Sequence, residues 1–204
     1  KGYAYETSTA IYFDISKLDK YPILSSINLE DQKAGARVEI DEEKRNPYDF
    51  ALWIKAPANH LMKWDSPWGP SYPGWHIECS AMSTKYLGEE FDIHTGGIDL
   101  IPTHHENEIA QSKGKCGKIP ARYWLHGEYL LINGGKMSKS LGNVYLVKDI
   151  KEKGFDPIVY KLFSYSCHYR NKLNFTWEGI ESATKSLERL RNSYQMNLNG
   201  TDKL

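Results

Sequence analysis

The most specific chemical pattern in the sequence is Lys136-Met137-Ser138-Lys139-Ser140, a short run that holds two lysines and two serines. Ammonium groups neutralise phosphate oxygens, and hydroxyls hydrogen-bond to them, as negative charge redistributes during the reaction of a triphosphate. The run follows the turn-forming residues Asn133-Gly134-Gly135, which predict a loop. We therefore expect Lys136 and Lys139 to contact phosphates from a flexible loop. A solvated basic loop is the alternative interpretation.

A second set of residues has the donor atoms of a metal site. His104 and Glu108 are four residues apart, so on a helix they share a face, and Cys79 comes from the preceding helical segment. Thiolate, imidazole and carboxylate are the usual ligands of zinc. The spacing leaves His104 and His105 open as alternatives, because His105 lies three residues from Glu108 and also reaches it. A buried structural cysteine and histidine pair is the competing interpretation.

Two helices and an intervening strand must position these groups. The apolar spacing over residues 75–86 predicts a helix that Gly88 ends, and residues 104–112 also have helical spacing. Between them, residues 91–94 have the length of a buried strand. Strands that alternate with helices are typical of an α/β fold with a parallel sheet.

The flanking segments have less specific patterns. Residues 3–15 predict a hairpin, residues 16–48 a charged surface insertion, and the Pro- and Gly-rich residues 65–74 a shaped loop. Residues 123–132 alternate as a strand does. An apolar stripe predicts a long helix near the end of the chain, through Ile180, Ala183, Leu187, Leu190 and Tyr194.

Composition limits the class of protein. The 204 residues are 40% apolar, and 26 Lys and Arg balance 26 Asp and Glu, so any contact with nucleic acid must be local. The sequence has no apolar run near the roughly 18 residues that cross a bilayer. Cys79, Cys116 and Cys167 form no C-x-x-C pair and fit a reducing compartment, so we expect a cytoplasmic protein. Because the first residue is Lys1 rather than Met, we also expect a fragment.

Several blocks of the sequence resemble the cysteinyl-tRNA synthetases, a family of class I aminoacyl-tRNA synthetases. Their order and spacing match over nearly the whole chain, and Arg45-Asn46-Pro47 and His168-Tyr169-Arg170 extend the likeness. The main blocks are Gly74-Trp75-His76-Ile77-Glu78-Cys79-Ser80-Ala81-Met82, Phe91-Asp92-Ile93-His94, Gly96-Gly97 with Asp99-Leu100, His104-His105-Glu106-Asn107-Glu108, and the Lys136 loop. Pro102-Thr103 and Thr95 depart from the family's usual Phe-Pro and third glycine.

The resemblance implies a role for each candidate site residue. Lys136 and Lys139 would act in catalysis. The implied zinc ligands are Cys79, His104 and Glu108, with one ion per chain. The implied ATP-binding residues are Lys139, Gly96, Gly97 and Asp99, with Mg²⁺ accompanying the ATP. The implied amino-acid pocket holds Trp75 and His94. A core tryptophan and a hydrogen-bonded core histidine are the alternative interpretation of the last pair.

The resemblance also implies an organisation. The implied fold is α/β. It is the second half of a Rossmann-like class I synthetase catalytic core with a surface insertion, followed by a helical segment. Residues 1–72 would be the connective insertion and hairpin region, residues 73–150 the second half of the catalytic domain, and residues 151–204 a helical segment that contacts the tRNA stem. The family's His-x-Gly-His motif and fourth zinc ligand, a cysteine, belong to the first half. The fragment alone is therefore expected to be inactive.

The implied reaction is the ATP-dependent activation of L-cysteine to cysteinyl-adenylate and its transfer to tRNA(Cys). A thiol, with a pKa of about 8.5, binds zinc as a thiolate, whereas the hydroxyl of serine is a harder and poorer ligand. Zinc would thus select cysteine. Two alternatives are a cysteine ligase of mycothiol synthesis with the same adenylate chemistry, and a non-catalytic zinc-stabilised RNA-binding module.

Overall fold

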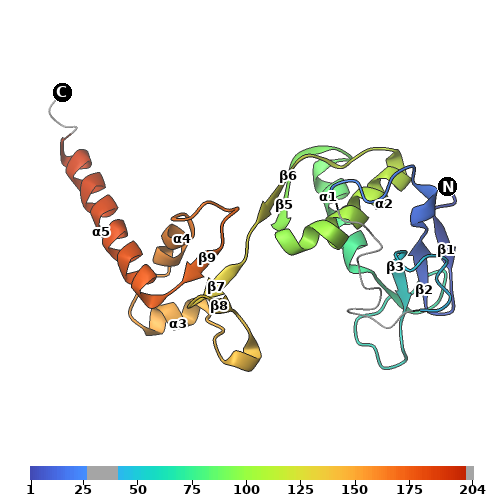
Figure 1. Cartoon of the computed structure of the whole chain (residues 1–204), viewed down its shortest axis with the longest axis horizontal. Coiled ribbons are helices and arrows are strands. Elements are labelled where there is room, and N and C mark those ends of the chain that lie inside the picture. The colour runs from blue at the N-terminus through green and yellow to red at the C-terminus, as the bar shows by residue number, and fades with distance from the viewer. Residues whose placement is uncertain (27–40, 201–204) are drawn as a thin grey trace. The chain divides into compact units, whose positions relative to one another are not determined.

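A computed structural model describes residues 1–26 and 41–200, with side chains through residue 198. The chain forms two compact units, Lys1–Leu125 and His126–Leu204, which are described separately below (Figure 1). The boundary falls inside residues 73–150, the range that the resemblance assigns to one catalytic domain. The division into three functional segments expected from the sequence stays a prediction, because two compact units do not show which function each part of the chain has.

The first unit begins with an antiparallel sheet in the order β1-β2-β3-β4. Its strands are β1 (Ala4–Glu6), β2 (Ala10–Phe13), β3 (Phe50–Lys55) and β4 (Ser71–Pro73). The β1–β2 pairing, with Tyr5 opposite Tyr12, confirms the predicted hairpin. Strand β4 lies at the sheet edge, where a proline such as Pro73 leaves few ladder hydrogen bonds unmade.

Two helices follow this sheet and carry most of the candidate site. Helix α1 (Trp75–Leu87) ends at Gly88, whose φ of 93° favours glycine, and the predicted helix is confirmed. Strand β5 (Phe91–Gly97) leads through the 3₁₀ turn Ile98–Leu100 and the π-helical turn Ile101–His105 into α2 (Glu106–Cys116). Strand β6 (Ala121–Gly127) then pairs with β5.

Helix α2 packs its apolar face on the sheet. Ala110 is buried in one cluster with Phe13, Ile15 and Phe50, and the rings of Phe13 and Phe50 stack with centroids 5.0 Å apart. Burial of these side chains anchors the helix by the hydrophobic effect. The residues from the end of the π-helical turn into the start of α2, His104 to Glu108, are consequently held in the protein interior.

Part of the segment predicted as a surface insertion is packed rather than solvated. Tyr21 donates from its hydroxyl to Asn107 Oδ1 at 2.7 Å, and the backbone N–H of Ile23 donates to Glu106 Oε2 at 2.7 Å. Glu106 is a buried acceptor, so these contacts satisfy a carboxylate that would otherwise be costly to bury. The prediction for residues 16–48 is therefore wrong at this point; residues 27–40 lie outside the described part.

The second unit is a small α/β assembly with sheet order β8-β7-β9. Strands β7 and β9 are parallel, and β7 turns into β8 through Asn133 and Gly134, both at positive φ, as the turn signal predicted. Its elements are β7 (Leu130–Ile132), β8 (Gly135–Lys136), the 3₁₀ turn Lys139–Leu141, α3 (Val147–Glu152), α4 (Ile158–Ser164), β9 (Leu173–Phe175) and α5 (Trp177–Gly200).

Helix α5 confirms the predicted long helix, but only the first part of its apolar stripe is packed against the core. Ile180 and Ala183 are buried in the core of this unit, and Leu187 packs against it. Leu190 and Tyr194, on the same stripe, are 57% and 63% exposed. Amphipathic spacing therefore identified the helix correctly and did not show where packing ends.

Two strand predictions need correction. Residues 123–132 form two strands in different sheets, β6 and β7, instead of one. Strand β5 is longer than residues 91–94 and its side chains are partly or fully exposed, so it is not a buried strand. Alternation of apolar residues cannot show which partner a strand has, because pairing is set by distant residues.

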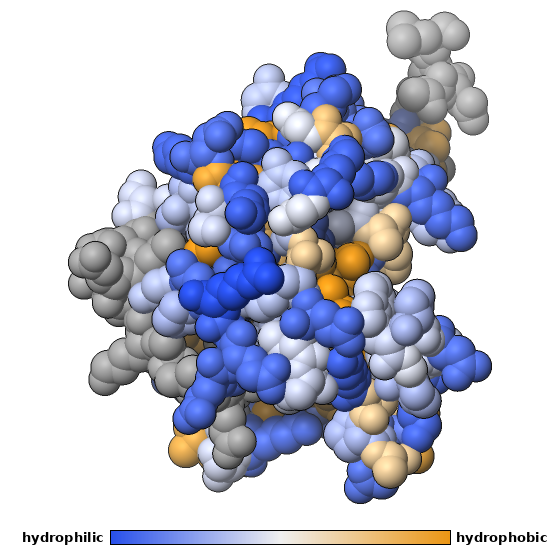
Figure 2. Space-filling model, turned by 90° about the vertical axis from the view of Figure 1, so that its right-hand side faces the viewer, coloured by the Kyte–Doolittle hydropathy of each residue, from blue (hydrophilic) through white to orange (hydrophobic). Residues whose placement is uncertain are grey.

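Surface composition agrees with the low mean hydropathy of the sequence. On the face drawn in Figure 2, hydrophobic residues are visible as separate patches between hydrophilic ones. Within the described residues, no helix has the length and apolar character to cross a membrane.

Candidate functional site

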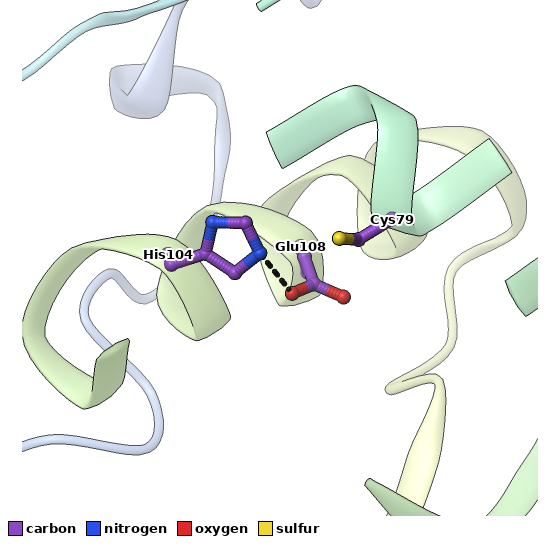
Figure 3. Close-up of side chains that lie close together, drawn as sticks. All are labelled: Cys79, His104 and Glu108. Atoms are coloured by element: carbon purple, nitrogen blue, oxygen red, sulfur yellow. Dashed lines mark ion pairs between the residues drawn. The ribbon is translucent and has the colours of Figure 1, made fainter. Parts of the chain in front are cut away.

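The first unit brings the three predicted metal ligands together. Cys79 comes from α1, His104 from the π-helical turn and Glu108 from the first turn of α2. One donor atom from each side chain lies within 4.8 Å of the others, and Figure 3 shows the three converging. The ligand set predicted from the sequence is therefore assembled in space, although its ion stays a proposal.

The carboxylate of Glu108 lies at the centre of this group. It is only 2% exposed, with Oε1 2.9 Å from His104 Nε2 and Oε2 3.3 Å from His94 Nε2. Oε1 accepts no hydrogen bond from the described residues in spite of its short distance to His104. The imidazole nitrogen and the carboxylate oxygen form an ion pair without a hydrogen bond, and both are atoms that bind Zn²⁺ in proteins, so the pair fits a metal ion.

His105 lies next to Glu108 but is not grouped with Cys79 and His104. It forms a second possible metal-binding group with His94 and Glu108. Its ring is buried, and a Cβ on Gly96 would come within 2.6 Å of its Cε1 atom. Thus the two histidines that the sequence could not separate are both next to Glu108, but His104 alone shares a group with Cys79.

The local electrostatics favour neutral ligands. Burial lowers the pKa of His104, and burial followed by the neighbouring His104 lowers the pKa of His76 to about 4. Burial, and then the charge of Glu108, raise the pKa of the Cys79 thiol. A neutral imidazole is the form that binds metal ions, and a nearby cation would reverse the effect on the thiol.

His76 is a neighbour of the site that sequence reasoning missed. Its Nδ1 lies 2.9 Å from Nδ1 of His104, so one of the two rings donates to the other and fixes the orientation of His104. A sequence signal existed, because His76 lies three residues before Cys79 and shares its helix face. Trp124 was also missed, and its position on a strand offered no such periodic signal.

Trp75 and His94, the residues expected to line an amino-acid pocket, both lie next to the ligand group. The Trp75 ring contacts His104 with centroids 4.3 Å apart, and its side chain is largely exposed. The His94 ring contacts Trp124 at 4.7 Å and also meets Glu108. Each of the two side chains therefore contacts one residue of the ligand group, and their place in an amino-acid pocket stays a prediction.

Gly96, Gly97 and Asp99 lie where β5 ends. A Cβ on Gly97 would come within 2.4 Å of Asp99 Oδ1, so the glycine lets the chain turn tightly in front of this carboxylate. Asp99 is exposed in the following 3₁₀ turn. The carboxylate is thus accessible to a ligand, and the expected contact with adenosine remains a prediction.

Lys136 and Lys139 belong to the second unit and are both exposed. The loop that carries them is held by Asn143, whose Nδ2 donates to the Lys136 carbonyl at 2.9 Å and whose Oδ1 accepts from the Ser138 N–H at 2.8 Å. The hydroxyls of Ser138 and Ser140 lie 2.8 Å apart. This loop therefore presents two ammonium groups on an internally hydrogen-bonded frame.

Comparison with known proteins adds a family and a fold. A family model described as tRNA synthetases class I (C) catalytic domain matches residues 1–185. Proteins named cysteine--tRNA ligase are similar to this chain: that of Treponema denticola is 52% identical over 98% of this chain and 41% of its own length. That of Carboxydothermus hydrogenoformans is 54% identical over 96% of this chain and 42% of its own length.

A solved structure supports the fold alone. LeuRS of Agrobacterium radiobacter K84, determined in a ternary complex with tRNA and LeuAMS, matches 68% of this chain and 22% of its own with a TM-score of 0.50 and 18% sequence identity. The α/β fold of a class I synthetase core expected from the sequence is thereby confirmed. The chain spans about two fifths of the length of the curated relatives described above.

Proposed function

Since the chain belongs to the family of class I tRNA synthetase catalytic domains, we propose that it is part of a cysteine–tRNA ligase, an enzyme that activates L-cysteine with ATP and transfers it to tRNA(Cys). The activity is assigned to the full-length protein. We also propose that the protein acts in the cytoplasm and that residues 1–72, 73–150 and 151–204 serve as its connective, catalytic and stem-contact segments.

The observation that carries this proposal is the group formed by half-buried Cys79 with buried His104 and Glu108. One soft sulfur ligand, one imidazole and one carboxylate suit Zn²⁺, and the unbonded Oε1 of Glu108 leaves a ligand atom available to it. When bound, the ion would supply a soft Lewis acid to which a substrate thiol is a better ligand than a hydroxyl.

The residues around this group would bind and orient the amino acid. Trp75 contacts His104 from the exposed side, so its indole can cover the small side chain of a bound cysteine. His94 contacts the far oxygen of Glu108 and thereby limits how this carboxylate can rotate. Steric fit separates small side chains by only about 1–3 kcal/mol, so the choice between cysteine and serine falls to the ligand atoms.

The lysine loop would act on ATP. Attack of the amino-acid carboxylate on the α-phosphate of ATP, which would be bound with Mg²⁺, breaks the bond to pyrophosphate and moves negative charge onto the leaving group. Lys136 and Lys139 would neutralise that charge, and positioning carries most of the remaining catalysis. Gly96, Gly97 and Asp99 would bind the adenosine, with the Asp99 carboxylate accepting hydrogen bonds from the ribose.

The test is the exchange of labelled pyrophosphate into ATP by the full-length protein, with each of the twenty amino acids in turn. Exchange that depends on cysteine and is not supported by serine is the expected result. A metal-content measurement on the same sample should give one zinc per chain. Exchange that depends on another amino acid, or absence of exchange from a folded, zinc-loaded protein, would contradict the proposal.

A further inference from the structure

The side chain of Asn143 closes the loop of residues 136–143, here called the lysine loop, into a ring. Its Nδ2 donates to the Lys136 carbonyl at 2.9 Å, and its Oδ1 accepts from the Ser138 N–H at 2.8 Å. One amide group therefore binds the backbone seven residues and five residues earlier in the chain. Lys139 lies inside this ring, so the position of its backbone depends on the two hydrogen bonds.

Short-range hydrogen bonds shape the turn inside the ring. The Leu141 N–H donates to the Ser138 carbonyl at 3.2 Å. The Gly142 N–H donates to the Lys139 carbonyl at 3.1 Å, and Gly142 has a φ of 65°, which favours glycine. This left-handed residue turns the chain so that Asn143, the next residue, reaches back to the start of the loop.

Apolar packing alone leaves the lysine loop room to move. The side chains of Met137 and Tyr145, on either side of the turn, pack against the core of the second unit. A pocket of about 110 Å³ lies beside both of them, and methionine is a flexible side chain that adapts to such a space. Leu141, between them, is 68% exposed. The middle of the loop therefore depends on its polar contacts.

A fixed backbone matters for the chemistry expected of this loop. An ammonium group stabilises developing charge best when it is already in place before the reaction. The Lys139 side chain is exposed and hangs on a flexible four-carbon stem. If its backbone also moved, the freedom of the whole segment would be lost in reaching the transition state, which raises the barrier.

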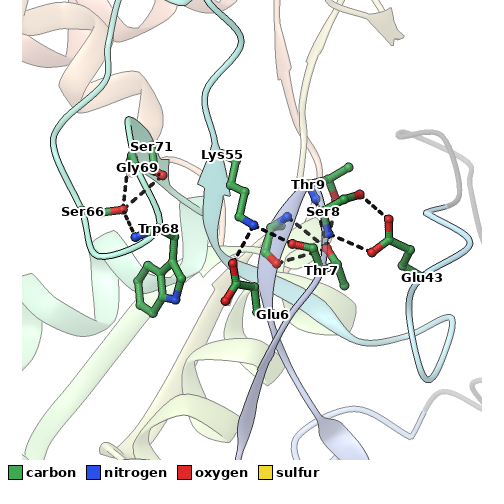
Figure 4. A network of polar contacts seen from close by, with 11 residues as sticks. Glu6, Thr7, Ser8, Thr9, Glu43, Lys55, Ser66, Trp68, Gly69 and Ser71 are labelled. Atoms are coloured by element: carbon green, nitrogen blue, oxygen red, sulfur yellow. Dashed lines mark hydrogen bonds and ion pairs between the residues drawn. The ribbon is translucent and has the colours of Figure 1, made fainter.

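A side chain in the first unit braces a turn in the same way but in a different chemical setting. Ser66 Oγ donates to the Gly69 carbonyl at 2.7 Å and accepts from the Trp68 N–H at 3.1 Å (Figure 4). Residues 66–69 contain no lysine or arginine. Ser66 thus shapes a backbone that presents no cationic group, and it is the matched comparison for Asn143.

From these observations we propose that Asn143 is a positioning residue for adenylate formation, which acts by holding the backbone that carries Lys139. The inference rests on the proposed function, since it assumes that Lys139 acts on ATP. Each polar atom of the Asn143 amide is bonded to the loop backbone, so its effect reaches the substrate through the lysine. Asn143 should therefore affect the rate of the chemical step and leave the choice of amino acid unchanged.

The first experiment measures single-turnover adenylate formation by the full-length protein. Asn143→Ala should slow this step about 5- to 150-fold, the range that corresponds to the loss of two hydrogen bonds, with little change in the KM for cysteine. Asn143→Ser should behave alike, because its hydroxyl is too short to reach both backbone groups, and it replaces the alanine variant if that one does not fold. Ser66→Ala should keep the parental rate. A parental rate in a folded Asn143 variant would overturn the inference.

A double variant with Lys139→Ala separates positioning from other roles. If Asn143 acts through Lys139, the double variant should be no slower than Lys139→Ala alone, because the ammonium group to be positioned is gone. A double variant whose loss equals the product of the two single losses would show that Asn143 acts independently, by a general structural role or by direct contact with the substrate. That result would also overturn the inference.

Hydrogen exchange tests the geometry without reference to the reaction. The Ser138 amide should lose protection in Asn143→Ala and keep it in Ser66→Ala, since Oδ1 of Asn143 is its acceptor. Retained protection in the Asn143 variant would contradict the proposed contact. Failure of this inference leaves the cysteine-dependent activity of the parent intact, whereas absence of adenylate formation in the parent would reject the proposed function and this inference with it.

Discussion

Nε2 of His104 lies 2.9 Å from Oε1 of Glu108, one helical turn further along the chain. The pair spans the junction between the π-helical turn Ile101–His105 and α2 (Figure 3). A π-helical turn rotates the side chains that follow it relative to a regular α-helix, and such turns are frequent at functional sites. The junction therefore sets which histidine faces Cys79.

Cys79→Ser in the full-length protein should lower zinc content sharply and reduce the preference for cysteine over serine. The reason is the exchange of a soft thiolate ligand for an alcohol that does not ionise at neutral pH. Elemental analysis and adenylate formation with each amino acid are the measurements. A full equivalent of zinc together with the parent's preference would remove Cys79 from the metal site.

Replacing each histidine in turn distinguishes the two groups that share Glu108. His104→Asn should lose zinc, whereas His105→Asn should retain most of it, since His104 alone is grouped with Cys79. Zinc content per folded chain, with folding checked by circular dichroism, is the measurement. The opposite order would assign the ion to the group of His94, His105 and Glu108.

Lys139→Ala should slow adenylate formation by about 10- to 1,000-fold while cysteine binding changes little. The lysine would act on charge that develops at the phosphates in the transition state, so its loss should appear in the rate of the chemical step. Single-turnover kinetics measure this rate. Lys148→Ala, a lysine in α3 outside the loop, is the control, and an unchanged rate in Lys139→Ala would contradict the assigned role.

Local patterns predicted the elements of the site well. The helix over α1 follows from apolar spacing and from Gly88, and the turn before Lys136 follows from Asn133 and Gly134, because each depends on neighbours in the sequence. The four-residue spacing of His104 and Glu108 likewise predicted a shared face. These inferences needed no knowledge of tertiary structure.

Contacts between distant segments could not be predicted in this way. The sequence placed Glu106 in a block next to the candidate metal ligands and gave no sign that it is buried. Its burial depends on the backbone N–H groups of Ile23 and Ser25, about eighty residues earlier, which donate to its carboxylate. The choice between His104 and His105 depends on the winding of a π-helical turn that no propensity encodes. Such features arise where tertiary packing overrides local preference.

Glu106→Gln should destabilise the first unit and loosen the segment that contains Ile23 and Ser25. Glu106 is fully buried and its two carboxylate oxygens accept the backbone N–H groups of Ile23 and Ser25. An amide in its place turns one acceptor into a donor that faces an N–H group, which should cost about 1–3 kcal/mol of unfolding free energy. Glu90→Gln is the matched control, because Glu90 pairs with Lys118 on the surface, where an ion pair contributes about 0–1 kcal/mol. Urea denaturation gives the free energies, and hydrogen exchange at Ile23 and Ser25 reports the local contact. Equal stability of the two variants, with protection at Ile23 retained, would show that Glu106 does not anchor this segment.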